Sequence, residues 1–137
     1  MSLFSKRKKI KLEKIWKIKR NCLELIFECA KSNHPREFGG FLRIDENAKD
    51  TISELVILPG TISGDYHAIF KMHMLPIDFT IVGTVHSHPS PYPRPSEADL
   101  NLFQKHGKVH IIVASPYNEK TWRAYNSLGQ EKNMQVV

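Results

Sequence analysis

The sequence predicts one domain that contains both strands and helices, because short β-rich runs and two amphipathic helical segments occur along its 137 residues. A chain of this length has room for a single hydrophobic core. Apolar residues make up 41% of the composition, a little under the ordinary globular range, which still indicates a folded unit. We expect one domain over residues 15–137, preceded by a flexible basic arm over residues 1–14.

The positive charge is concentrated at the N-terminus. Residues 1–20 hold nine Lys or Arg residues and one acid, whereas residues 21–137 hold eleven basic and thirteen acidic residues. Residues 21–137 are therefore close to neutral, and the net charge of +6 comes from residues 1–20, which include the arm. Such an arm can touch nucleic acid or an acidic surface, but a solvated tail is the commoner outcome. Nucleic-acid binding is not expected as the main role.

In the N-terminal half, hydrophobic periodicity predicts a strand, a helix and two further strands. Residues 12–18 alternate apolar and charged side chains, as a strand with one exposed face does. Residues 21–32 place their apolar side chains on one helical face, and Asn33-His34-Pro35 ends that helix. Strands are expected at 38–44 and 52–58 around a polar turn at 45–50, with a weaker strand candidate at 65–72.

In the C-terminal half, the β-branched run before His86 predicts a buried strand over residues 80–88. Three prolines between residues 90 and 95 hold the next segment extended, and a helix is expected over 96–106, ending at Gly107. The remaining strands are expected at 109–114, which is buried, and at 121–125 and 134–137, which would pair antiparallel about a turn near Gly129.

The most specific feature is a cluster of zinc-ligand side chains between residues 86 and 99. On a strand, His86 and His88 are two residues apart, so both rings leave the same face of the sheet. Asp99 falls in the first turn of the predicted helix, facing back toward the end of the strand. Two imidazoles and one carboxylate leave a fourth position for water, which is how proteins hold a catalytic zinc ion.

Each of these residues also has a simpler interpretation. His86 and His88 taken alone are equally well explained as buried structural histidines. Ser96 and Asp99 form the pattern of a helix cap, which is compatible with a metal site because the cap would anchor the helix. Glu37 taken alone is an ordinary surface acid. The metal interpretation therefore depends on all of these residues occurring together.

The remaining histidines and the cysteines indicate no further metal site. Cys22 and Cys29 share one helix face roughly 10 Å apart along its axis, too far for a disulfide, so we expect buried free thiols. The other histidines lack a second ligand at a useful spacing and are expected on the surface or in the core; they are His34, His67, His73, His106 and His110.

Together, these residues resemble the motif of the JAMM (MPN+) zinc metalloproteases. That motif is an upstream Glu, then His-Ser/Thr-His-Pro, six residues, Ser, two residues and Asp. The match is complete, with Glu37, His86-Ser87-His88-Pro89, Ser96 and Asp99. The resemblance runs from roughly Trp16 to the last strand and is closest to small single-domain archaeal members. It implies a cytidine-deaminase-like α/β sandwich, with a mixed central sheet flanked by helices.

The resemblance also implies an activity and a role for each residue. One zinc ion per chain would be held by His86, His88 and Asp99, with Glu37 as general base and Ser96 stabilising the intermediate. The family hydrolyses amides, usually the isopeptide bond between the C-terminus of a ubiquitin-like protein and a lysine. Two alternatives are processing of the C-terminus of a sulfur-carrier protein and a non-catalytic MPN scaffold. Retention of every ligand argues against the scaffold.

The substrate and setting are expectations of the same kind. An extended substrate tail would add as a strand beside a sheet edge, for which residues 64–71 are the candidate. The short chain indicates a minimal catalytic core, expected as a monomer or homodimer. No apolar run reaches the roughly 18 residues that a membrane span needs, and no signal-peptide pattern is present. We therefore expect a cytoplasmic protein.

Overall fold

The computed structural model describes residues 14–57 and 78–137; the predictions for the rest of the basic arm, the strand candidate at 65–72 and the substrate edge at 64–71 lie outside the described residues. The elements are β1 (Trp16–Ile18), α2 (Arg20–Asn33), β2 (Gly39–Asp45), β3 (Ala48–Val56), β4 (Ile81–His88), α4 (Glu97–Lys105), β5 (Val109–Ala114), β6 (Trp122–Asn126), β7 (Glu131–Lys132) and β8 (Met134–Val136). Most predicted elements are present within a few residues. The β2–β3 turn is tighter than predicted, since both strands extend into residues 45–50.

The strands form one mixed sheet in the order β7-β6-β5-β4-β2-β3-β1-β8. The β4–β5, β1–β3 and β1–β8 pairs are parallel, and the others are antiparallel. The prediction of an α/β fold with a mixed central sheet is therefore confirmed. The likeness to cytidine deaminases that the family resemblance implies stays a prediction.

The predicted final hairpin between residues 121–125 and 134–137 is wrong. The turn near Gly129 exists, with a φ of 79° at this glycine, but it joins β6 to the short strand β7. β8 pairs instead with β1 in parallel, in a register that sets Met134 against Trp16. Side-chain alternation identifies which residues are extended, but it does not select the neighbouring strand.

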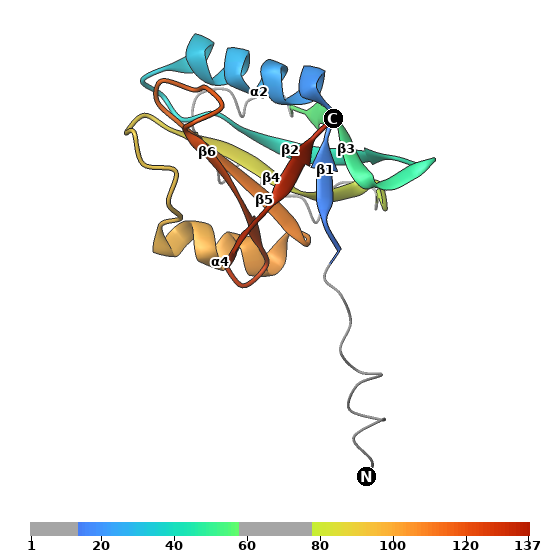
Figure 1. Cartoon of the computed structure of the whole chain (residues 1–137). Helices are drawn as coiled ribbons and strands as arrows, with labels where there is room; N and C mark the ends of the chain where they lie inside the picture. The colour runs from blue at the N-terminus through green and yellow to red at the C-terminus, as the bar shows by residue number, and fades with distance from the viewer. Residues whose placement is uncertain (1–13, 58–77) are drawn as a thin grey trace.

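The sheet is rolled, so that its two ends meet. β7 and β8 stand at opposite ends of the strand order, yet only Asn133 separates them in the chain. Successive Cα atoms are 3.8 Å apart, so the two ends of the sheet approach within roughly 8 Å. Figure 1 shows β8, the dark red strand at the C-terminus, beside β1. In the strand order, β1 and β8 are at one end of the sheet and β6 and β7 are at the other.

The two helices of the described ranges, α2 and α4, lie on opposite faces of the sheet (Figure 1). α2 packs its apolar stripe, which includes Leu23 and Ile26, on the face that carries Ile111 and Val113 of β5. α4 packs Phe103 against Ile112 and Tyr125 on the opposite face. Consecutive residues of β5 therefore pack into two different hydrophobic clusters, one on each face of the sheet, because this strand is buried on both faces. No helix in the described ranges is long and apolar enough to cross a membrane.

The two cysteines match their predicted state in part. Both are free thiols; Cys22 is buried in the α2 cluster, whereas Cys29 is only half-buried. Burial, with a smaller contribution from the charge of Glu54, raises the pKa of Cys22 to about 11. This thiol is therefore a packing group rather than a nucleophile at neutral pH.

Candidate metal centre

β4 delivers two imidazoles to the α4 face of the sheet. His86 stands beside Ile112 in the parallel register of β4 and β5, and Ile112 belongs to the α4 cluster. His86 is 1% exposed, and its ring centroid lies 5.0 Å from that of His88. The intervening Ser87 is directed to the other face, beside Val113 of the α2 cluster. The predicted alternation along this strand is confirmed.

α4 delivers Asp99 through the cap that begins the helix. Ser96 is the N-cap residue, and its Oγ accepts a hydrogen bond from the Asp99 amide at 3.1 Å. In return, Asp99 Oδ2 accepts from the Ser96 amide at 2.8 Å. This capping box holds the carboxylate on the first turn of the helix. Asp99 is therefore both the partner of Ser96 in the capping box and a candidate metal ligand, as the spacing predicts.

The donor atoms of three side chains converge to the separations that a tetrahedral zinc ion requires. The Nε2 atoms of His86 and His88 are 3.2 Å apart. Asp99 Oδ1 lies 3.1 Å from Nε2 of His86, and Oδ2 lies 3.2 Å from Nε2 of His88. Tetrahedral bonds of about 2.0–2.1 Å set neighbouring ligand atoms roughly 3.3 Å apart. The residues therefore fit zinc, and among the described residues they form the only such cluster of His, Cys, Asp or Glu.

The electrostatics of the cluster favour an ionised carboxylate. Burial opposes ionisation of Asp99, but hydrogen bonds with His86 and His88 outweigh burial and hold the pKa of Asp99 well below its ordinary value. Burial likewise opposes a charge on His88, but the bonds to Asp99 and to the Tyr92 carbonyl, with the charges of Asp99 and Glu37, raise the pKa of His88. The ionised carboxylate of Asp99 thus gives the site a negative charge that would attract and bind a metal cation.

The loop after β4 orients the His88 ring. His88 Nδ1 lies 3.1 Å from the carbonyl oxygen of Tyr92, so a proton on Nδ1 leaves the Nε2 lone pair for a metal ion. The same loop is fastened by the Tyr125 hydroxyl, which donates to the Pro93 carbonyl at 2.6 Å. These orienting groups were not predicted. The carbonyl of Tyr92 carries no side-chain signal in the sequence, and Tyr125 comes from a different strand.

β2 brings Glu37 to the same end of the sheet. In the antiparallel β2–β4 pair, Gly39 stands opposite His86. If the same pairing is extended two residues before the start of β2, Glu37 stands opposite His88. Between these pairs, the Ser87 amide donates to the Phe38 carbonyl at 2.8 Å, and the Phe38 amide donates to Ser87 Oγ at 2.8 Å. A residue 49 positions upstream of His86 thus stands at the metal ligands. The sequence did not reveal the Ser87–Phe38 contact.

Ser96 keeps a hydroxyl hydrogen available at the rim of the site. Its Oγ accepts from the Asp99 amide within the cap, and its side chain is exposed to solvent. Because the Ser96 oxygen only accepts in this bond, its O–H group can still donate a hydrogen bond to another partner.

The other described histidines lie outside the metal cluster. His110 is fully buried, stacks on Phe103 at 4.3 Å, and has its Nδ1 atom 2.7 Å from the Thr84 hydroxyl. It is a core histidine, as expected. His34 is exposed and bonded to Tyr117, and His106 is half-buried. His67 and His73 lie outside the described residues.

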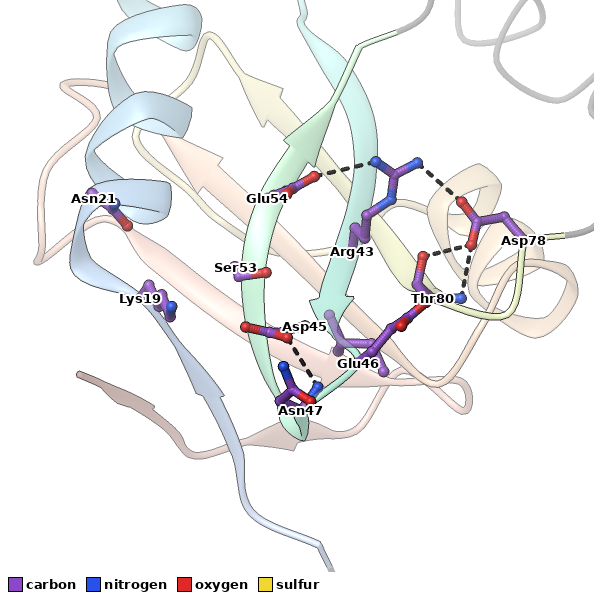
Figure 2. Close-up of a pocket in the computed structure, with 11 residues that line it drawn as sticks. Lys19, Asn21, Arg43, Asp45, Glu46, Asn47, Ser53, Glu54, Asp78 and Thr80 are labelled. Carbon is purple, nitrogen blue, oxygen red and sulfur yellow. Dashed lines mark hydrogen bonds and ion pairs between the residues drawn. The ribbon is translucent and has the colours of Figure 1, made fainter.

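A separate polar cavity of about 660 Å³ lies at the opposite end of β4. Figure 2 shows the guanidinium of Arg43, on β2, reaching toward Glu54 of β3 and toward Asp78. These contacts measure 3.2 and 3.0 Å. Thr80 lines the cavity just before β4 begins, so the length of β4 separates the cavity from His88 by roughly 25 Å. Its central cation already has two carboxylate partners, which makes it an ion-pair network rather than part of the metal centre.

Comparisons with known proteins agree with this geometry. Residues 19–127 match the family of prokaryotic homologues of the JAB domain. A probable metalloprotease from Haloferax volcanii is 35% identical over 127 residues, covering 88% of this chain and 78% of that protein. The crystal structure of a JAB1/MPN domain protein from Archaeoglobus fulgidus is 41% identical, with a TM-score of 0.71, and covers 91% of this chain and 100% of its own.

A further solved structure is described as JAMM, a metalloprotease-like zinc site in the proteasome and signalosome. It is 43% identical to this chain with a TM-score of 0.70, and the match covers 90% of this chain and 98% of that one. The family match spans most of the described sheet and both helices, including the strand and helix that carry the ligand cluster. The chain therefore belongs to the prokaryotic JAB family and is a JAMM-type metalloprotease with a zinc site.

Proposed function

We propose that this metalloprotease is an isopeptidase that hydrolyses the amide bond at the C-terminus of a ubiquitin-like modifier protein. The observation that carries the proposal is the convergence of His86, His88 and Asp99 to mutual distances of 3.1–3.2 Å, with Glu37 in register opposite His88. The candidate ligands and the proposed acid–base group then meet at one end of the sheet. The ubiquitin-like substrate is supported by the family resemblance of the motif.

His86, His88 and Asp99 are proposed as the zinc ligands. When bound there, zinc polarises the scissile carbonyl and lowers the pKa of an attacking water to about 7. Glu37 takes the proton from the attacking water and passes it to the departing lysine nitrogen, so that the amine leaves uncharged or protonated. General acid–base catalysis of this kind contributes typically a hundred- to ten-thousand-fold in rate.

Ser96 is proposed to donate its hydroxyl hydrogen to the oxyanion that forms on the carbonyl. The cap fixes the hydroxyl oxygen on the first turn of α4, beside the carboxylate that binds the metal. A donor held in place before the reaction needs no reorganisation as charge develops, and one such donor is worth about 2.7–4 kcal/mol in known cases.

The experiment pairs zinc content with cleavage of a lysine-linked ubiquitin-like fusion, with and without chelator. One zinc per chain and chelator-sensitive cleavage support the isopeptidase, and Glu37→Gln should keep the zinc while losing turnover. A linear adduct at the same C-terminus, tested in parallel, identifies processing of a sulfur-carrier protein if it alone is cleaved. Bound zinc with neither substrate cleaved would contradict both hydrolases and favour the scaffold alternative.

The basic arm is proposed to be separate from catalysis. The described domain holds its ligand cluster on β4 and α4, and neither element includes residues of the arm. Removal of residues 1–14 should leave turnover and zinc content unchanged, whereas any nucleic-acid binding should disappear. A catalytic loss on truncation would assign the arm to substrate capture. Sedimentation of both forms distinguishes a monomer from a homodimer.

A further inference from the structure

The short segment that carries Glu37 is held on both sides. On its C-terminal side, the Phe38 amide donates to Ser87 Oγ at 2.8 Å. On its N-terminal side, three residues before Glu37, the Nδ1 atom of His34 lies 2.7 Å from the Tyr117 hydroxyl. The two rings meet edge to face, with centroids 5.6 Å apart and an interplanar angle of 70°. The first anchor is on β4 and the second follows β5.

Tyr117 is a rigid support rather than a surface loop residue. It is 3% exposed and belongs to the α2 core cluster, although it lies beyond the end of β5. Its backbone has a φ of 63°, and its amide donates to the Ala114 carbonyl at 2.7 Å. A bulky residue in this region costs of order 1–3 kcal/mol and persists only where its surroundings determine it. Packing and the backbone bond therefore fix the position of the phenol ring.

The support is also tied to the metal-ligand strand. Ala114 stands beside His88 in the parallel register, and the Ser115 amide donates to the His88 carbonyl at 3.3 Å. The loop that carries Tyr117 thus leaves the sheet at the edge where the metal cluster lies. Burial is the largest cause that raises the pKa of Tyr117, and the negative charge of Glu37 adds to it. The phenol therefore keeps its proton, and Tyr117 and Glu37 interact electrostatically.

We propose that Tyr117 is a positioning residue for the hydrolytic reaction, acting through its bond to His34 to hold the Glu37 segment over the metal ligands. This inference rests on the proposed function, in which Glu37 moves the proton. A general base works only within hydrogen-bond reach of the proton that it removes. Displacement of a reacting group by about 1 Å can lower a rate on the order of a hundredfold. If the His34–Tyr117 bond were lost, the segment that carries Glu37 would be held only at Phe38 and would move by such distances.

The first test removes only the bond. Tyr117→Phe should keep one zinc per chain and leave KM within about twofold, while kcat falls on the order of tenfold or more. His34→Ala should reproduce this loss, and the double variant should lose no more than either single one, because both remove the same contact. His34→Gln, which restores a hydrogen-bonding group, should recover part of the rate. Glu28→Gln, which weakens the exposed Glu28–Lys31 pair on α2 outside the site, is the control and should be silent.

The second test asks whether Tyr117 acts through Glu37. In a Glu37→Gln background, Tyr117→Phe should cause no further loss of residual turnover. An equal loss in both backgrounds would overturn the inference, since the tyrosine would then act on another group. Unchanged kcat in Tyr117→Phe, with an active parent enzyme, would overturn it as well.

A third measurement does not depend on activity. The Arg36 amide donates to the Asn33 carbonyl at 2.8 Å within the anchored segment. Hydrogen exchange at Arg36 should be about tenfold faster in Tyr117→Phe, with exchange in β5 unchanged. If the parent protein cleaves neither substrate, the proposed function fails, yet this exchange still decides whether the anchor exists. Equal exchange at Arg36 in both proteins would show that it does not.

Discussion

The hydroxyl oxygen of Ser87 accepts a hydrogen bond from the Phe38 amide at 2.8 Å, joining the strand of the metal ligands to the residue that follows Glu37. Both partners are fully buried, and 49 positions separate them in the chain. The contact lies on the face of the sheet opposite to the metal ligands. The residue between the two histidines therefore supports the segment of the proposed acid–base group, while its neighbours are the candidate metal ligands.

Replacing Ser87 with Ala should lower both stability and turnover. The Phe38 amide would lose its partner in a buried position, which costs about 1–3 kcal/mol in the free energy of unfolding. Urea unfolding should show that loss, and kcat should fall by more than zinc content does. Ser53→Ala, on β3 away from the site, is the control. A Ser87→Ala enzyme with parental kcat would show that this contact does not position Glu37.

Replacing Asp99 with Asn should abolish stable zinc binding and spare the helix. The amide retains an oxygen for the Ser96 amide in the cap, whereas the ionised ligand is lost. Zinc per chain after gel filtration should drop from one to a small fraction. Glu97→Gln removes an acid from the same helical turn and should keep its zinc. Full zinc retention in Asp99→Asn would mean that another group holds the third position.

Replacing Tyr125 with Phe should lower the affinity of the site for zinc, although Tyr125 is not itself a candidate ligand. Loss of the 2.6 Å bond to the Pro93 carbonyl frees the loop whose Tyr92 carbonyl orients His88. Groups that orient a metal ligand are typically worth 10- to 100-fold in metal affinity. Competition with a chelator should therefore show zinc affinity reduced about tenfold or more. Affinity equal to that of the parent would assign Tyr125 to packing against Phe103 alone.

The stability of the domain should fall in mild acid because of His110. Burial, the largest cause, lowers the pKa of this ring from 6.5 to about 4. The unfolded chain takes up a proton as the pH falls below 6.5, but the folded chain does not until near pH 4. The stability present above pH 6.5 is thus lost toward pH 4, by up to about 3 kcal/mol.

A comparison of His110→Gln with the parent isolates this contribution. Urea unfolding of both proteins at about pH 7 and about pH 4.5 should show a smaller decline in the variant, because glutamine does not titrate. His106, whose pKa is also lowered, chiefly by burial, remains in both proteins and cancels in the difference. Identical declines would mean that His110 is protonated in the folded state.

Local spacing was enough to predict the metal cluster. The two-residue period of a strand puts His86 and His88 on one face, and the three-residue spacing of the cap puts Asp99 on the first turn of α4. Each inference concerns residues within one element. Eight residues join the strand to the helix, and the three prolines between residues 90 and 95 restrict the relative position of the two elements.

Contacts between distant segments were not predictable in the same way. The His34–Tyr117 bond joins residues 83 positions apart, and no periodicity in either segment specifies the other. The pairing of β8 with β1 rather than β6 has the same origin, since alternation alone is satisfied by either neighbour. The placement of Glu37 came from resemblance to a motif, and it needed the β2–β4 register for a physical explanation.

The rolling of the sheet has a consequence for behaviour in concentrated solution. An open sheet exposes rows of unpaired amide and carbonyl groups along its outermost strands, and these rows template association with other chains. Here the outermost strands have only two and three residues, Glu131–Lys132 and Met134–Val136, and they are directed toward each other. Lys132 adds a charge beside the junction. Within the described residues, these ends offer no long strand on which aggregation by edge-to-edge pairing could begin.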